Sequence, residues 1–200
     1  MLSNRARLIV KTIVSTVLGL GVIGVVGGLI VLRGGFYNIS ATESHYPLIY
    51  TVFEEGLQYS IQNHARDIQV PELGAPEQLL RGAAIYAANC VQCHGGPGTA
   101  PSRHGMSMQP VPGPLVDADT NWRARELYWI TRHGIKMSGM PAWEYHLSDS
   151  DIWATVAFVS AMPAMTTQDF KRMTAAGADT TSVPKAVVES ARASAQEDES

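Results

Sequence analysis

The two cysteines of this chain, Cys90 and Cys93, stand three residues apart, and His94 directly follows the second one. On a helix, this spacing brings the two thiols within one turn of each other, with an imidazole beside them. Cysteines so close in sequence cannot staple a fold, which argues against a disulfide scaffold and favours a cofactor or redox role. These three side chains are the first candidates for chemistry.

Cys90-Val91-Gln92-Cys93-His94 is the attachment signature of c-type haem. The two thiols would add to the vinyl groups of one porphyrin as thioethers, and the imidazole would supply an axial nitrogen to iron. A thioredoxin-like dithiol is one alternative, but no strand–helix alternation surrounds Cys90. A zinc site is another; it lacks a second cysteine pair and would take His104 as fourth ligand. The motif predicts one covalently bound haem c.

The region from about Pro76 to Pro163 resembles a class I cytochrome c domain. RGAAIYAANCVQCHG resembles the family's N-terminal helix and haem motif, ITRHGIKMSGMPAW the segment that delivers an axial methionine, and LSDSDIWATVAFV the C-terminal helix. The resemblance implies an all-α domain over residues 76–165. The apolar N-terminus and the YNISATESHYP connector further resemble membrane-bound single-haem members, through less specific motifs.

Met140, within Gly139-Met140-Pro141, is the predicted sixth ligand, and the match to the family's G-M-P-A segment carries most of this assignment. A thioether is a soft, neutral ligand that favours ferrous iron. Met137 is the main rival, and Met106 and Met108 are weaker ones. Isolated histidines are more often surface residues, so a bis-histidine site is disfavoured for His104, His133 and His146, and still more for His45 and His64, which precede the domain.

Two further sets of residues are expected to support the ligands. In class I cytochromes a proline carbonyl accepts the other ring N–H of the ligating histidine, and Gly113-Pro114-Leu115 resembles that turn; Pro114 is the candidate, although Pro110 and Pro112 leave the register open. Gly82 and Tyr86 resemble the face of the family's N-terminal helix that crosses the C-terminal helix, where Trp153, Val156 and Ala157 would form the opposing surface. Ser148 and Asp151 resemble a capping box at the start of that helix. Trp129, Trp143 and Phe158 are expected to wall the haem.

An uncharged apolar run extends from Thr12 to Leu32. As a helix it would be about 31 Å long, close to the thickness of the hydrocarbon core of a bilayer. Arg5, Arg7 and Lys11 precede it, so the positive-inside rule predicts a cytoplasmic N-terminus and a haem domain in the periplasm, anchored by one pass through the bacterial inner membrane. A cleaved signal peptide is the alternative; the long run and the missing Ala-x-Ala site disfavour it.

The sequence thus divides into an anchor (1–33), an extracytoplasmic connector (34–75), the cytochrome domain (76–165) and a tail (166–200). In the connector, apolar residues after Pro47 recur on one helical face: Leu48, Ile49, Val52, Phe53, Leu57 and Ile61. This face must pack on the domain, the membrane or a partner subunit. The tail is rich in small and polar residues, so most of it is predicted to be disordered.

The net charge of −3 gives no reason to expect nucleic acid. The preferred function is single-electron transfer, as a subunit or shuttle of a respiratory chain with no activity of its own. The partners expected are redox proteins: a periplasmic dehydrogenase, a quinol-oxidising complex or a terminal oxidase. Two alternatives stay open: a haem enzyme or gas-binding protein with an open sixth site, and an assembly subunit of a larger membrane complex.

Overall fold

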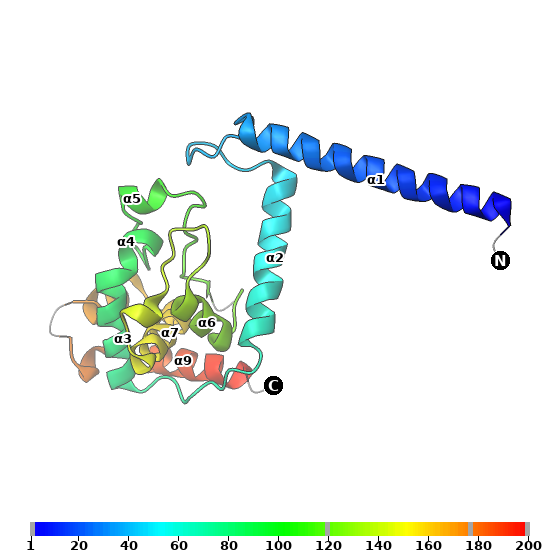
Figure 1. The fold of residues 1–200 in the computed structure, drawn as a ribbon. Coiled ribbons are helices and arrows are strands. Elements are labelled where there is room, and N and C mark those ends of the chain that lie inside the picture. Colours follow the sequence, from blue (N-terminus) through cyan, green and yellow to red (C-terminus); the bar gives the residue numbers. More distant parts are fainter. Residues whose placement is uncertain (1–2, 119–120, 176–177, 199–200) are drawn as a thin grey trace. The chain divides into compact units, whose positions relative to one another are not determined.

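A computed structural model describes residues 3–118, 121–175 and 178–198 (Figure 1). Within these ranges the chain is helical and has no strand, which confirms the all-α fold. The helices are α1 (Asn4–Arg33), α2 (Pro47–Ala65), α3 (Pro76–Asn89), α4 (Val91–His94), α5 (Arg103–Met106), α6 (Ala124–His133), α7 (Asp149–Ser160), α8 (Thr167–Met173) and α9 (Lys185–Glu197), with 3-10 turns η2 (Trp143–Tyr145), η3 (Met162–Ala164) and η4 (Thr180–Ser182). The chain forms two units, residues 1–43 and 44–200.

The first unit consists mainly of α1. Ser3 caps the helix by accepting a hydrogen bond from the amide of Ala6 at 3.3 Å, and none of the helix's residues is buried against protein. By length and composition α1 is apolar enough to cross a membrane. This is consistent with a single-pass anchor, although a signal sequence near an N-terminus has the same properties.

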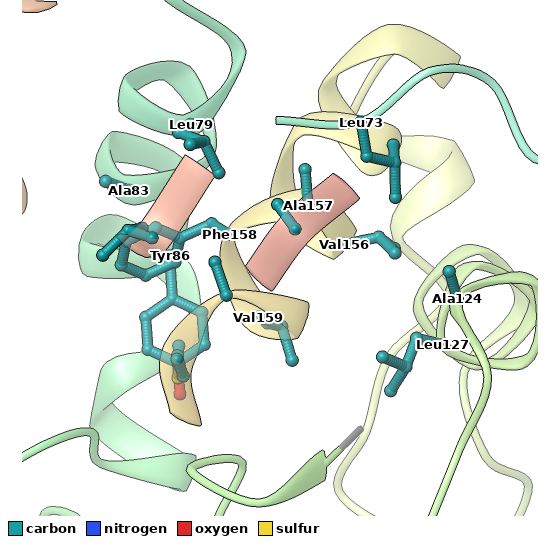
Figure 2. Close-up of a cluster of buried hydrophobic side chains, with 14 of the residues drawn as sticks. Leu73, Leu79, Ala83, Tyr86, Ala124, Leu127, Val156, Ala157, Phe158 and Val159 are labelled. Atoms are coloured by element: carbon teal, nitrogen blue, oxygen red, sulfur yellow. The ribbon is translucent and has the colours of Figure 1, made fainter. Parts of the chain in front are cut away.

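The core of the second unit is built around α7, whose residues 152–160 are all buried. Gly82 lies where α3 crosses α7, since a Cβ built on it would stand 2.0 Å from the carbonyl oxygen of Ala154. One turn later, the rings of Tyr86 and Phe158 lie 5.5 Å apart, centroid to centroid. Figure 2 shows Phe158 beside Tyr86, and Val156 on the side of α6. The closest approach of two helix backbones therefore needs a residue without a side chain.

The predicted α3–α7 contact is confirmed for Gly82 and Tyr86, but the prediction of Trp153 and Val156 as part of the opposing surface is wrong, since Val156 lies on the side of α6. Trp153 stacks on Tyr128 of α6, with ring centroids 4.1 Å apart and planes 14° apart. The reason is that α7 is covered on two sides, by α3 and by α6 (Figure 2). Residues at i, i+3 and i+4 of a helix buried all round cannot be assigned to one neighbour from their spacing alone.

The connector does contain a helix, α2, but the domain covers only its C-terminal part. Ile61 and Ala65 are buried against the domain, and α2 packs on α6. Nearer the start of the helix, Leu48 and Val52 keep 76% and 59% of their surface exposed. The apolar face predicted from the sequence is therefore only partly covered within this chain.

The prediction of a disordered tail is wrong for the described residues after Thr166. A capping box opens α8, in which Thr166 N donates to Asp169 Oδ2 and Asp169 N donates to Thr166 Oγ1, both at 3.1 Å. Large apolar side chains of the tail join the core: Phe170, Met173 and Val187. Composition misled here because a few apolar residues at helical spacing are enough to dock two helices on an existing core.

Candidate functional site

The two cysteines lie at the junction of α3 and α4. Cys90 ends α3, its amide donating to the carbonyl of Tyr86 at 2.9 Å. The amides of Cys93 and His94 both donate to the carbonyl of Cys90 at 3.0 Å, which winds the motif into one turn. Both thiols are free and partly buried. Burial raises the pKa of Cys90 to about 12, with a smaller contribution from the neighbouring Cys93.

His94 is oriented by a hydrogen bond from its own ring. Its Nδ1 lies 2.8 Å from the carbonyl oxygen of Gly113. A carbonyl can only accept, so Nδ1 carries the proton and Nε2 has a lone pair for a metal. The predicted acceptor, the carbonyl of Pro114, is wrong by one residue. Successive carbonyls of an extended segment point to opposite sides, so sequence register alone could not decide between neighbouring positions.

Two hydrogen bonds from other parts of the domain fix the turn that holds His94. The hydroxyl of Tyr86 donates to the carbonyl of Gly95 at 2.9 Å, and the amide of Ser102 donates to the carbonyl of Gln92 at 2.9 Å. Gly105 in α5 lies directly on the motif, because a Cβ there would stand 2.9 Å from the Cα of Cys93. The sequence analysis missed Gly105; its signal, a glycine in a short polar loop, is weak.

Met140 lies in a loop that is closed by its own backbone. Its carbonyl accepts from the amide of Ile135 at 3.2 Å, and its amide donates to Ser138 Oγ at 3.1 Å. At the base of the loop, Gly134 has a left-handed φ of +67°, and a Cβ there would stand 2.6 Å from the backbone of Pro141. Both peptide groups of Met140 are therefore fixed, while its side chain is partly buried.

The rival methionines differ from Met140 in their surroundings. Met137 exposes 82% of its surface at a left-handed φ of +61°, and Met106 exposes 60%. Met108 is partly buried, and its sulfur would stand 2.6 Å from a Cβ on Gly139, so its thioether rests on the loop of Met140. Residues 105–108 thus contact the Cys93 turn at one end and the Met140 loop at the other.

The structure places the three residues expected to wall the haem in different surroundings. Phe158 is fully buried between Tyr86 and Phe170, in the α3–α7–α8 core, so its assignment to a haem wall is wrong. Trp129 lies 5.5 Å from the ring of His64 on α2, centroid to centroid. Trp143 follows the Met140 loop, and its buried indole N–H has no hydrogen-bond partner among the described residues.

The remaining histidines form no ligand set with the cysteines of the motif in the part of the chain that the structure describes. His104 is exposed on α5, His133 lies 3.5 Å from Glu144, and His146 lies 6.1 Å from the ring of Trp143. Over residues 3–118, 121–175 and 178–198, no group of three or more His, Cys, Asp or Glu side chains is placed to hold a metal ion. The zinc alternative through His104 therefore gains no support from the geometry.

The donor set fits haem c. Two free thiols lie one helical turn apart, the adjacent imidazole has its Nδ1 bonded and its Nε2 free, and a partly buried thioether is held in a closed loop. These are the groups that thioether attachment and axial ligation of one haem iron require.

Comparison with known proteins agrees with this site. Residues 77–159 match the family described as subunit III of cbb3-type cytochrome c oxidase. The matched region spans α3 to α7 and includes both cysteines, His94 and Met140. This chain therefore carries a c-type cytochrome domain, as its motifs predicted. Searches among curated proteins and among solved structures gave no significant match.

Proposed function

We propose that this chain is a membrane-anchored carrier of single electrons, with one haem c attached to Cys90 and Cys93 and ligated by His94 and Met140. The observation that carries the proposal is the bond from His94 Nδ1 to the Gly113 carbonyl, because it leaves Nε2 free for iron. Haem c, when bound, supplies reversible Fe(III)/Fe(II) exchange.

The protein's part in this chemistry is to keep both axial ligands in place. The carbonyl of Gly113 fixes the ring plane of His94 and increases its basicity. The closed loop fixes the backbone of Met140. If its sulfur is the second ligand, the iron would have no open coordination position for a substrate. A site of this kind favours electron exchange over binding and transforming a small molecule.

The charges near the ligands suggest which surface a redox partner offers. Residues 95–116 and 130–143, which hold or flank both ligands, contain no Asp or Glu, although the chain as a whole has 18 acidic residues. They contain Arg103 and Lys136, which are exposed, and Arg132, whose charge is paired with Glu144 and Asp149. We therefore expect a partner with an acidic face around its own redox centre, since opposite charges speed encounter.

The location and the partners that we propose are supported by the apolar helix α1 and by the matched family. We propose that α1 anchors the chain in the bacterial inner membrane, with the basic N-terminal end that carries Arg5, Arg7 and Lys11 on the cytoplasmic side and the haem domain in the periplasm. Tethering keeps the domain near membrane-bound partners and makes repeated encounters nearly intramolecular. A periplasmic dehydrogenase or a quinol-oxidising complex would supply electrons. A terminal oxidase would accept them, in keeping with the name of the family matched by residues 77–159.

The proposal is tested on the full-length protein produced with haem attachment. Wild type should give a pyridine haemochrome spectrum of haem c and a mass increased by one haem. Met140→Ala should remove the far-red sulfur–iron absorption band and yield high-spin ferric haem. Met137→Ala is the matched control, since it changes the same residue type in the same loop at an exposed position.

Three outcomes would contradict the proposal. A colourless protein of unaltered mass would exclude attachment at Cys90 and Cys93. Loss of the far-red band in Met137→Ala but not in Met140→Ala would transfer the ligand role to Met137. A wild-type protein that is high-spin and binds carbon monoxide rapidly would favour the haem enzyme or gas-binding alternative.

A further inference from the structure

The segment that carries Met140 is joined to α6 by a side chain as well as by its backbone. Arg132, in the last turn of α6, donates from Nε to Glu144 Oε2 at 3.3 Å and from Nη1 to Asp149 Oδ1 at 3.0 Å. Glu144 lies in η2, four residues after Met140, and Asp149 begins α7. One guanidinium thus connects the helix before the ligand loop to the two elements that follow it.

This connection is fixed to the core through Tyr128, one turn earlier in α6. The Tyr128 hydroxyl accepts from Arg132 Nη1 at 2.6 Å and donates to Asp149. Its ring is buried and stacks on Trp153 of α7. The pKa of Arg132 is raised, first by its hydrogen bond to Tyr128 and its electrostatic interaction with that side chain, and then by the hydrogen bond to Glu144. The guanidinium is therefore positioned by a rigid part of the domain.

We propose that Arg132 is a positioning residue for Met140 and thereby sets how readily an outside ligand can reach the iron. The inference rests on the proposed function, because it takes Met140 as the sixth ligand. Without the guanidinium, Glu144 and Asp149 lose a shared cation and the segment after Met140 loses its tie to α6. His133, whose Nδ1 lies 3.5 Å from Glu144 Oε1, would retain part of the contact.

The chain offers a matched control in a second ion pair. Arg81 of α3 donates to both carboxylate oxygens of Asp151 in α7, at 2.7 and 3.1 Å. This pair also joins two helices through an exposed arginine, but it does not involve the segment between α6 and α7. Losing it should loosen the domain without releasing Met140 selectively.

The experiment titrates imidazole against the ferric full-length holoprotein in detergent, and follows loss of the far-red sulfur–iron band. Arg132→Gln should bind imidazole about three- to tenfold more tightly than wild type, the size expected when one or two partly exposed ion pairs are lost. Arg132→Lys keeps the charge but cannot donate to both carboxylates as a guanidinium does. Its imidazole affinity should lie between those of wild type and Arg132→Gln. Arg81→Gln should bind imidazole like wild type.

If Arg132→Gln fails to load haem, Glu144→Gln removes one exposed partner and should give a smaller gain in the same direction. Unchanged imidazole affinity in Arg132→Gln, or in Glu144→Gln if only that variant loads haem, overturns the inference. An equal gain in Arg81→Gln also overturns it, because the effect would then be general loosening. These failures differ from failure of the proposed function, in which wild type itself lacks the band or keeps it in Met140→Ala.

Discussion

The helices α1 and α7 are both strongly apolar, yet they have opposite surroundings. Residues 152–160 of α7 are all buried by protein, whereas α1 buries none of its 30 residues. At about 1.5 Å per residue, α7 is too short to cross a bilayer and α1 is long enough. Apolar composition therefore does not decide where a helix lies. Two other properties decide whether an apolar helix belongs in a protein core or in lipid. They are its length and whether neighbouring elements of the same chain can cover it.

The largest effect is expected from a substitution at the crossing of α3 and α7, which would remove the protein cover of α7. Gly82→Val should abolish folding of the haem domain, because a side chain there must push against the backbone of Ala154 and separate the two helices. Circular dichroism and haem yield provide the measurement. Gly56→Val is the matched control, since nothing lies within 4 Å of a Cβ at that position of α2. Normal haem yield in Gly82→Val would show that the crossing adapts.

In α1, an introduced charge is expected to oppose membrane insertion, because α1 would be surrounded by lipid and not by protein. Leu20→Asp combined with Ile23→Asp should oppose membrane insertion by about 5–7 kcal/mol in total. The protein should then be lost from carbonate-washed membranes, while any haem domain recovered keeps its spectrum. Ile39→Asp, at an exposed position after α1, should leave the protein in the membrane fraction. Retention of the double variant would argue against a lipid environment for α1.

Replacing Phe170 tests how much of the cover of α7 comes from the tail. Its ring lies 6.0 Å from that of Phe158 and also contacts Gly96, just after the haem motif. Phe170→Ala should reduce the free energy of unfolding by about 3–5 kcal/mol, because it leaves a cavity in the core. Urea unfolding of the holoprotein measures the loss. A loss under about 1 kcal/mol would mean that α8 packs only loosely on α7.

The smallest predicted effect is the pH dependence of the Arg81–Asp151 pair. The hydrogen bond from Arg81, more than any other cause, lowers the pKa of Asp151 below its usual value. A lowered folded-state pKa stabilises the fold above the unfolded value of about 4, and this contribution disappears as the pH falls through the folded-state pKa. Arg81→Gln should therefore be slightly less stable than wild type at pH 6, and the difference should shrink in acid. A difference that is constant with pH would contradict the assignment.

The local motifs could be predicted from the sequence better than their surroundings. The spacing of Cys90, Cys93 and His94 predicted one helical turn, and the structure forms it, because such a turn depends only on residues close in sequence. The crossing of Gly82 with α7 was also foreseen, through the resemblance of Gly82 and Tyr86 to the family's N-terminal helix face. Pro114 was placed one residue too far, because the carbonyl that faces an imidazole depends on the path of a loop.

The errors concern contacts between distant segments. Phe158 was expected beside the haem and lies against Phe170, which belongs to a tail that was expected to be disordered. Trp153 was assigned to α3 and stacks on Tyr128 of α6. In each case the sequence shows an apolar residue that needs burial but does not specify its neighbour. The contacts of Arg132 and Gly105 were missed because neither residue stands in a recognisable pattern.

The continuous burial of residues 152–160 has a consequence for amide hydrogen exchange. Amides inside α7 are covered by α3 and α6 at once, so local fraying cannot expose them to solvent. In deuterated water, the amides of Val156 to Val159 should exchange only when the whole domain opens, later than those in the first turns of α2. Their exchange rate would then report the global stability of the domain directly.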